Sequence, residues 1–136
     1  MNREARPVTL GQVLISIVIP AFNEAKYLPV SLEAAHRSRA VLGQAGWTSE
    51  VIVCDNNSTD ETAAVARANG ARVVFEPFNQ IAASRNAAGL AARGDWLVFV
   101  DADTQVSPRL FREMMRTMAR DDCLGGGCPV RFDSGP

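Results

Sequence analysis

Several features that mark common classes of protein are scarce in this sequence of 136 residues. Positive charge is not in excess, because 14 Lys and Arg residues face 15 Asp and Glu residues, for a formal net charge of -1. A surface that neutralises a nucleic-acid backbone needs such an excess, so we expect no nucleic-acid partner. No apolar run approaches the ~20 residues of a membrane-spanning helix. We therefore expect a cytoplasmic protein and leave peripheral membrane association open.

Cysteine and the common nucleotide-binding motifs are also scarce. Three cysteines are too few for a disulfide scaffold, and the free-thiol form is expected. Cys123 and Cys128 flank a glycine run, but no further Cys or suitably spaced His completes a zinc site. Neither the Gly-x-Gly-x-x-Gly pattern nor the P-loop pattern is present, which argues against classical dinucleotide and ATP sites.

The sequence does contain short apolar runs that alternate with longer amphipathic segments. Nearly continuous apolar runs predict strands buried on both faces, and the longer segments predict helices. The predicted strands are 13–19, 50–54, 72–75 and 96–100, with a short one at 129–132, and the predicted helices are 24–42, 58–69, 81–92 and 108–120. Pro20 is expected to end the first strand. Ser58 and Glu61 fit a capping box, and Ser107 fits an N-cap.

This alternation predicts an α/β fold with a mostly parallel, Rossmann-like sheet and helices on both faces. Residues 1–12 are expected to be a flexible N-terminus and residues 13–136 a single domain. Ligands of such sheets bind at the carboxyl ends of the strands. Polar clusters follow three of the predicted strands, at residues 20–24, 55–58 and 101–104. We expect these clusters to meet in one crevice.

Two carboxylates follow the fourth predicted strand, those of Asp101 and Asp103. Residues two apart in an extended segment point to the same side, so both could address one cation. Magnesium commonly uses one or two protein carboxylates, with phosphates and water as the other ligands. A nucleoside diphosphate fits that requirement. The alternative is that Asp101 caps a turn while Asp103 is solvated.

Two further side chains are candidates for ligand contacts. Asp55 ends a buried strand, where its carboxylate can accept hydrogen bonds from a base or a ribose hydroxyl. Arg85 lies among small residues of a predicted helix, and we expect close packing around it. A buried arginine needs an anionic partner, either a crevice aspartate or a ligand diphosphate. His36 is expected to have a surface role, not a catalytic one.

Four segments of the sequence together resemble family 2 glycosyltransferases of the GT-A fold. The segments, in order, are Ile17 to Glu24, Val53 to Thr62, Ala83 to Gly89 and Phe99 to Thr104. The resemblance runs from about Val13 to Arg120 and covers the N-terminal portion that binds the nucleotide-sugar. It implies an enzyme that transfers a sugar from a nucleoside diphosphate-sugar to an acceptor, usually with inversion at the anomeric carbon.

The resemblance also implies roles for individual residues. The implied donor-binding residues are Pro20, Ala21 and Phe22 around the nucleobase, Glu24 near the ribose, Asp55 at the base, Arg85 near the base or diphosphate, and Asp101 and Ala102 on the ribose side. Asp103, with Asp101, would hold a divalent metal, Mg²⁺ or Mn²⁺, that neutralises the leaving diphosphate. A carboxylate base that deprotonates the acceptor would come from a later part of the domain.

The family domain continues for roughly another hundred residues, as ordinary domain size also suggests. We therefore expect either a truncated domain without the acceptor site or the base, or partner chains that supply the rest. An edge or apolar face exposed by such a truncation favours self-association. Two alternatives stay open at this stage: a fragment that binds nucleotide without transferring sugar, and a nucleotidyltransferase-like domain.

Overall fold

The structure is a computed structural model, and it describes residues 13–120 and 125–127. Its elements in chain order are β1 (Leu14–Ala21), α1 (Leu28–Gln44), β2 (Thr48–Asp55), α2 (Thr62–Ala68), β3 (Arg72–Phe75), α3 (Ile81–Ala91), β4 (Trp96–Phe99) and α4 (Pro108–Met118). All eight elements predicted within the described residues are present. The predictions for residues 1–12, for the strand at 129–132, and for Cys123 and Cys128 lie outside the described residues.

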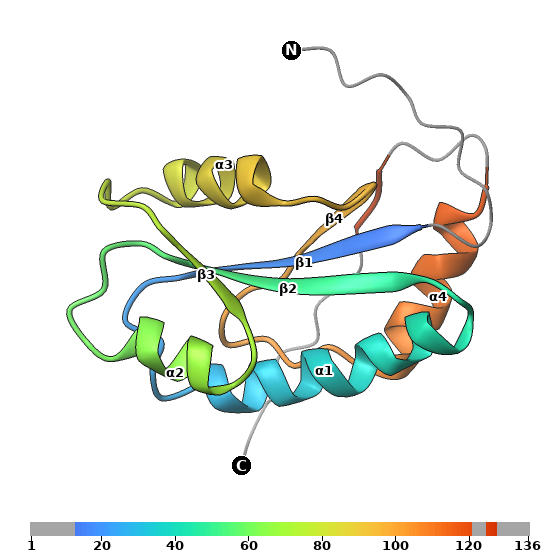
Figure 1. The fold of residues 1–136 in the computed structure, drawn as a ribbon, viewed down its shortest axis with the longest axis horizontal. Coiled ribbons are helices and arrows are strands. Elements are labelled where there is room, and N and C mark those ends of the chain that lie inside the picture. Colours follow the sequence, from blue (N-terminus) through green and yellow to red (C-terminus); the bar gives the residue numbers. More distant parts are fainter. Residues whose placement is uncertain (1–12, 121–124, 128–136) are drawn as a thin grey trace.

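The four strands form a parallel sheet in the order β3-β2-β1-β4. Helix α3 covers one face of the sheet, and α1, α2 and α4 lie on the opposite face (Figure 1). The predicted Rossmann-like α/β fold is therefore confirmed. Because all four strands run in the same direction, their loops gather at one edge, which we call the carboxyl edge. The opposite edge, where the strands begin, is the amino edge.

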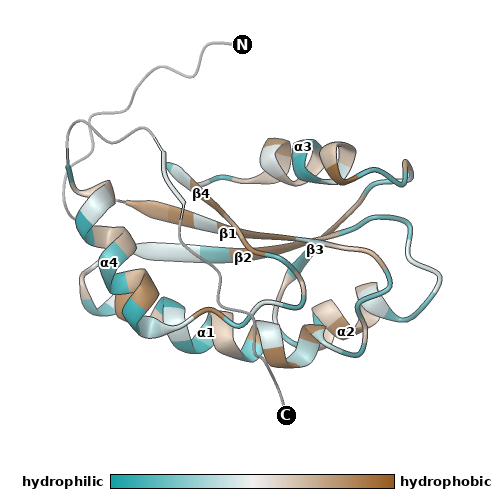
Figure 2. Cartoon of the chain, turned by 180° about the vertical axis from the view of Figure 1, so that it is seen from behind, coloured by the Kyte–Doolittle hydropathy of each residue, from teal (hydrophilic) through white to brown (hydrophobic). Residues whose placement is uncertain are grey.

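Alternate residues of the central strand β1 serve two cores. Ile15, Ile17 and Ile19 are fully buried and face α1 and α4, where Phe111 is also fully buried. Val18 faces the smaller core beneath α3. The strands are mostly apolar, apart from the first part of β2, while the helices carry many polar residues (Figure 2). This pattern is expected of a parallel sheet that is covered on both faces.

Strand β1 continues through Pro20 to Ala21, so the prediction that Pro20 ends it is wrong. Ala21 bonds toward β2, since its carbonyl accepts from the N–H of Asn56 at 2.9 Å. The backbone of Pro20 therefore points toward β4, on the side where Val18 accepts from Val100. Strand β4 has already ended at this level, so the missing N–H of the proline costs no bond to a neighbouring strand.

Two helix starts also differ from the predictions. Helix α1 begins at Leu28 instead of Glu24, after a turn, and Pro29 occupies its first turn. The capping box of Ser58 and Glu61 does not form, because the Ser58 hydroxyl accepts from the N–H of Asn23 in another loop. A tertiary contact thus replaces the local cap. The predicted cap of α4 is confirmed, with the Ser107 hydroxyl accepting from Leu110 N–H at 3.2 Å.

Polar groups at the amino edge are joined in one hydrogen-bonded cluster around Glu50. The carboxylate accepts from the Ser16 hydroxyl at 2.6 Å, from the Arg72 guanidinium at 2.8 Å and from the N–H of Arg93 at 2.7 Å. Burial alone would raise the pKa of Glu50, but these donors together hold it below the ordinary value. Ser16 in turn accepts from the N–H of Gly94. The cluster ties the starts of four strands together.

Candidate functional site

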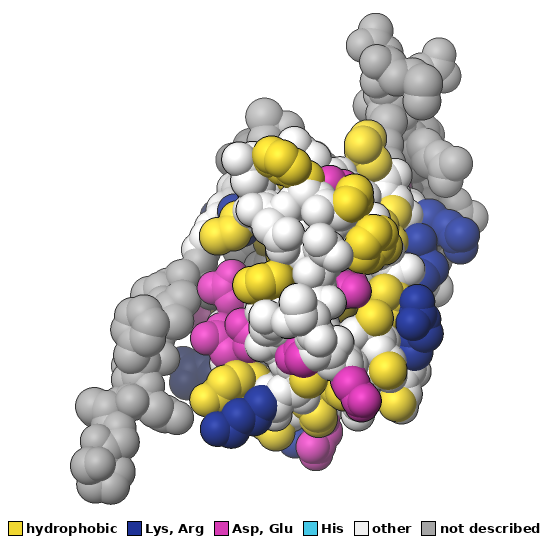
Figure 3. Space-filling view, turned by 90° about the vertical axis from the view of Figure 1, so that its left-hand side faces the viewer, with side chains coloured by type: hydrophobic (Ala, Val, Ile, Leu, Met, Phe, Trp, Pro, Cys, Tyr) yellow, Lys and Arg dark blue, Asp and Glu magenta, His cyan; other side chains and the backbone are white. Residues whose placement is uncertain are grey.

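The carboxyl edge of the sheet carries most of the residues predicted to bind a ligand. Figure 3 looks directly at this edge and shows acidic side chains across its middle, with hydrophobic side chains above and beside them. Exposed aromatic residues follow the strands here, including Phe22 after β1 and Phe75 and Phe99 at the ends of β3 and β4. Convergence of the three polar loops at one edge follows from the parallel sheet.

Acidic side chains of two other loops lie close enough to Glu24 to disfavour its ionised form. The pKa of Glu24 is raised, first by burial and then by the negative charges of Asp103 and Asp60. Each of these residues follows a different strand. No salt bridge within the described residues involves Glu24 or Asp103. The ionised form of Glu24 is therefore disfavoured at this edge.

Asp60, by contrast, is satisfied within its own surroundings. Its carboxylate accepts from the hydroxyl and the N–H of Thr62 and from the N–H of Ala25 at 3.2 Å. The Thr62 hydroxyl is the largest cause of its lowered pKa. Asp60 thus links the start of α2 to the loop after β1. It contributes negative charge to the edge while its oxygens already have donors.

The segment after β4 is a turn, which corrects the extended geometry assumed for Asp101 and Asp103. The N–H of Thr104 donates to the carbonyl of Asp101 at 3.0 Å, closing the turn. Both aspartate side chains are exposed, whereas Ala102 between them is buried. The methyl group of Ala102 packs in the larger core and anchors the turn. The two carboxylates therefore depend on the turn for their direction.

Asp55 is the buried acid of the edge, with its residue only 7% exposed. One carboxylate oxygen accepts from the N–H of Ser58 at 3.0 Å, so the side chain holds the loop after β2. No donor to its second oxygen is found among the described residues. A turn role and a ligand role can therefore coexist in this residue, one for each oxygen.

Arg85 lies on the exposed surface of α3, so the close packing expected around it is not found. Its guanidinium carbon is 5.0 Å from the centre of the Phe99 ring, a cation–π geometry. Phe99 ends β4, just before the turn that carries Asp101. The described residues give Arg85 no carboxylate partner. Its positive charge is thus held beside the carboxyl edge without being neutralised by an acid.

The remaining residues predicted around the base differ in what they expose. The side chain of Ala21 is buried in the larger core, and Pro20 is half-buried. Only Phe22 presents a large exposed side chain, at 50%. Of these three residues, a ligand at this edge would therefore meet mainly the ring of Phe22, because Ala21 is covered.

Sequence reasoning missed the contacts that join the loops. Asn23 adopts a positive φ of 51° and bonds to the loop after β2, and Asn56 donates to the carbonyls of Glu76 and Phe78 after β3. The signal was the enrichment of Asn in these segments. Asparagine tolerates left-handed backbone and replaces missing backbone partners. Which loop each side chain would reach could not be read from spacing.

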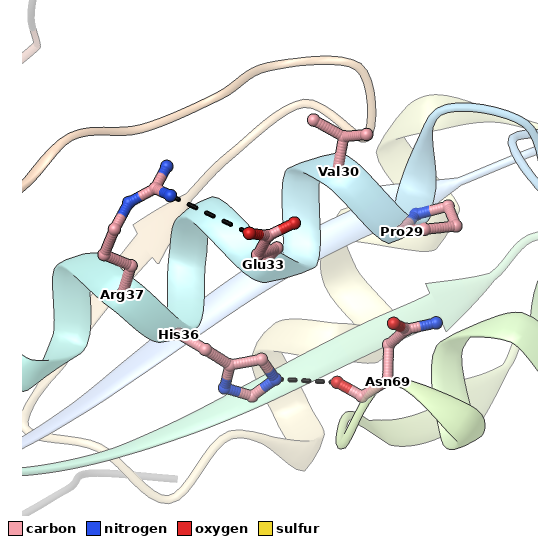
Figure 4. A pocket seen from close by; sticks show the side chains of 6 residues that line it. All are labelled: Pro29, Val30, Glu33, His36, Arg37 and Asn69. Carbon is pink, nitrogen blue, oxygen red and sulfur yellow. Dashed lines mark hydrogen bonds and ion pairs between the residues drawn. The ribbon is translucent and has the colours of Figure 1, made fainter.

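A surface hollow of about 600 Å³ lies away from the predicted site (Figure 4). It is lined by Pro29, Val30, Glu33, His36, Arg37 and Asn69, from α1 and the end of α2. His36 lies 2.7 Å through Nε2 from the carbonyl of Asn69, so this histidine joins two helices. None of the residues predicted to bind the donor lines the hollow.

Comparison with known proteins identifies the chain's family. The model of glycosyl transferase family 2 matches residues 16–136. The chain belongs to glycosyl transferase family 2. It is 36% identical over 104 residues to an uncharacterized glycosyltransferase of Mycobacterium tuberculosis, spanning 74% of this chain and 43% of the relative. A glycosyltransferase of Rickettsia prowazekii is 35% identical over 82 residues, spanning 60% and 28% of the two chains. The family 2 chain described here thus spans less than half the length of either relative.

Solved structures support the same assignment for this family 2 chain. Glucosyl-3-phosphoglycerate synthase from Mycobacterium tuberculosis, in complex with Mn²⁺, uridine diphosphate and glucosyl-3-phosphoglycerate, matches with a TM-score of 0.66 and 26% identity. The match covers 81% of this chain and 41% of that one. Mannosyl-3-phosphoglycerate synthase from Rubrobacter xylanophilus shares the fold, with a TM-score of 0.67, 24% identity and coverage of 81% and 37%. The GT-A fold expected from the sequence is confirmed.

Two further observations concern the described part of the chain only. No helix there is long and apolar enough to cross a membrane. No group of three or more His, Cys, Asp or Glu side chains there forms a complete protein cage for a metal ion. A site that shares its metal with a ligand's phosphates needs fewer protein carboxylates than such a cage.

Proposed function

We propose that this chain forms the donor-binding part of a family 2 glycosyltransferase, which holds a nucleoside diphosphate-sugar through a divalent cation. The observation that supports this most is that Glu24 lies near Asp103 and Asp60 at the carboxyl edge, where burial first and then these two charges raise its pKa. A built-in charge conflict of this kind is relieved by a cation. Family membership favours this function over a nucleotidyltransferase.

The residues present fit a metal shared with a diphosphate. Asp103 and Asp101 are exposed carboxylates on one turn, and they leave other positions of an octahedral Mg²⁺ or Mn²⁺ to phosphate oxygens and water. When bound, the cation would neutralise charge that develops on the diphosphate as the sugar leaves. Arg85 can add a second positive charge, because no acid among the described residues neutralises it.

The nucleoside has a separate set of candidate contacts in this proposal. Asp55 offers its second oxygen to a donor group of the base, and Phe22 offers an exposed ring. In the register of the sheet Ala21 pairs with Asp55, so the two strand ends lie at the same level. Glu24 then approaches the ribose. The sugar is proposed to be transferred with inversion to an acceptor whose site and base we do not assign to these residues.

Titration calorimetry tests the proposal directly. We expect one of UDP, GDP and dTDP to bind this chain in the presence of Mn²⁺ and to lose most of its affinity when the metal is chelated. The solved relative was crystallised with Mn²⁺ and uridine diphosphate, so UDP is the first probe. Absence of binding by all three nucleotides, with the chain folded by circular dichroism, would contradict the proposed function.

A further inference from the structure

One residue takes part in most of the hydrogen bonds that join the loop after β1 to the loop after β2. Six hydrogen bonds that involve a side chain join residues 23–25 to residues 58–62, and Asn23 takes part in four of them. Its Oδ1 accepts from Thr59 N–H at 2.8 Å, from Thr59 Oγ1 at 3.2 Å and from Asp60 N–H at 3.3 Å. Its own N–H donates to the Ser58 hydroxyl at 3.0 Å.

The backbone of Asn23 is as specific as its side chain. Its φ of 51° lies in the left-handed region, which Gly and Asn adopt far more readily than other residues. This reversal separates the exposed ring of Phe22 from Glu24, whose own N–H donates to Thr62 Oγ1 at 3.0 Å. A residue at this position must therefore accept three hydrogen bonds while keeping left-handed backbone. Glycine satisfies only the second requirement.

We propose that Asn23 is a positioning residue of the nucleotide site, which fixes the loop bearing Phe22 and Glu24 against the loop that begins at Asp55. This inference rests on the proposed function, because it assumes that one nucleotide contacts both loops. Asp55 ends β2 and Glu24 follows β1, and within residues 13–120 no hydrogen bond or ion pair joins the two side chains. Their separation is therefore set by the residues that join the loops. Loss of the Asn23 side chain would leave the strands intact but let the two halves of the site drift apart.

Asn57 provides a matched control, because it is also an asparagine with a left-handed backbone conformation. Its φ is 59°, and its side chain donates toward the next loop instead, to Pro77 O at 3.3 Å and Asn79 Oδ1 at 3.4 Å. Replacing either asparagine by glycine removes the side-chain bonds and keeps the left-handed backbone. Only the variant at Asn23 removes hydrogen bonds between the loops after β1 and β2, and it leaves the three that backbone N–H groups of residues 23–25 donate.

The experiment compares Asn23→Gly, Asn23→Asp and Asn57→Gly in the complete 136-residue chain. Amide hydrogen exchange without ligand measures the protection of the Thr59 and Asp60 N–H groups, and calorimetry measures the affinity for UDP with Mn²⁺. We expect Asn23→Gly to speed exchange of both amides at least tenfold and to weaken UDP binding at least tenfold, with cooperative unfolding retained. Asn57→Gly should change neither quantity more than threefold.

Asn23→Asp keeps an acceptor oxygen and tolerates left-handed backbone, so it should restore the amide protection. Protection is the rescue measurement because the added charge would also act on a charged ligand. UDP affinity of Asn23→Gly equal to that of the unaltered chain would overturn the inference, as would unchanged exchange of the Thr59 and Asp60 amides. If the unaltered chain binds no nucleotide, the proposed function fails and the positioning role fails with it. Faster exchange in Asn23→Gly would then show only that Asn23 joins the loops.

Discussion

The two edges of the sheet use carboxylates in opposite ways. At the amino edge Glu50 is surrounded by donors from Ser16, Arg72 and Arg93, and its pKa is lowered. At the carboxyl edge Glu24 is partly buried near two other acids, and its pKa is raised. An ionised glutamate thus stabilises the protein at the amino edge and destabilises it at the carboxyl edge. An acid with its partners built in serves the fold, whereas an acid that lacks them is suited to a ligand.

The difference extends to the backbone around each acid. The amino edge is closed by direct bonds between strand starts, and Gly94 packs so tightly there that no side chain fits. The carboxyl edge is built of loops that are joined by asparagine side chains, with exposed rings around them. We therefore expect substitutions at the amino edge to lower stability more, and we propose that ligand contacts lie at the carboxyl edge. Variants at the two edges should separate these two properties.

The largest effect is expected for Gly94→Ala at the amino edge. An added methyl group would lie 2.6 Å from the backbone nitrogen and hydroxyl of Ser16 and 2.8 Å from the carbonyl of Trp96. Backbone atoms of the central strands cannot move aside without breaking the sheet. We expect a loss of about 3 kcal/mol in the free energy of unfolding, at the upper end for overpacking. Urea denaturation measures it.

Gly43→Ala is the matched control for this prediction. Gly43 lies within α1 with nothing within 4 Å of the added methyl group. The same substitution should there raise stability by up to about 1 kcal/mol, because alanine favours a helix over glycine. If Gly94→Ala lowers the free energy of unfolding by less than about 1 kcal/mol, the backbone at the amino edge shifts to accommodate the methyl group more easily than the contacts indicate.

The second effect concerns Asp103 at the carboxyl edge. We expect Asp103→Ala to weaken Mn²⁺-dependent UDP binding at least 100-fold, about 2.7 kcal/mol, because it removes the proposed metal ligand. Stability should change by no more than about 0.5 kcal/mol, since the side chain is exposed and repels Glu24. Calorimetry and urea denaturation measure the two quantities on the same preparation.

Asp95→Ala tests whether any aspartate near a strand would have the same effect. Asp95 is exposed at the amino edge and accepts from the N–H of Leu14 at 2.9 Å. Its loss should cost about 1 kcal/mol of stability and leave UDP affinity unchanged. Equal losses of affinity in both variants would remove the proposed distinction between the edges.

A smaller effect is expected for substitution of Asp55. One of its carboxylate oxygens accepts a hydrogen bond within the protein, and the other is proposed to bind the ligand. Asp55→Ala should weaken binding of uridine without metal by about 2 kcal/mol, within the range for a hydrogen bond to a charged group. Stability should also fall, by about 1 kcal/mol, because Ser58 N–H loses its acceptor. Unchanged uridine affinity with reduced stability would make Asp55 a turn residue only.

The fold was largely predictable because it depends on patterns that are local in sequence. Buried runs such as Ile17 to Ile19 and the cap at Ser107 indicate their elements without knowledge of the rest. Errors arose where a distant segment decided the outcome. The end of β1 depends on where β4 stops, and Ser58 bonds to Asn23 instead of capping α2.

The site was predictable in its location but not in its geometry. Parallel strands bring their following loops together, so the gathering of Asp55, Asp101 and Asp103 at one edge follows from the topology. The turn at Asp101 and the exposure of Arg85 over Phe99 depend on side-chain contacts between elements. Such contacts are long-range, and no spacing rule encodes them.

The smallest expected effect concerns the pKa values of Glu24 and Glu50, which compare the two edges most directly. Glu24 has a raised pKa in the folded chain, so its ionised form costs stability above that pKa and the cost disappears as the pH falls through it. Glu50 has a lowered pKa, so its ionised form contributes stability above pH 4.5 that is lost as the pH falls through the lowered value. The two acids should therefore shift stability in opposite directions on acidification.

Carboxyl carbon shifts in NMR titrations can follow Glu24 and Glu50 separately. Asp103→Asn should lower the pKa of Glu24 only part of the way toward its ordinary value, because burial, the largest cause, remains. Asp95→Asn, at the amino edge, should leave the pKa of Glu24 unchanged. Mg²⁺ is used in place of Mn²⁺ in these titrations, because Mn²⁺ broadens nearby signals. Adding Mg²⁺ with UDP should lower the pKa further, since a cation favours the ionised acid. If neither Asp103→Asn nor Mg²⁺ with UDP changes the pKa of Glu24, Glu24 and Asp103 are not close to each other in solution. That result would contradict the proposed metal site at the carboxyl edge.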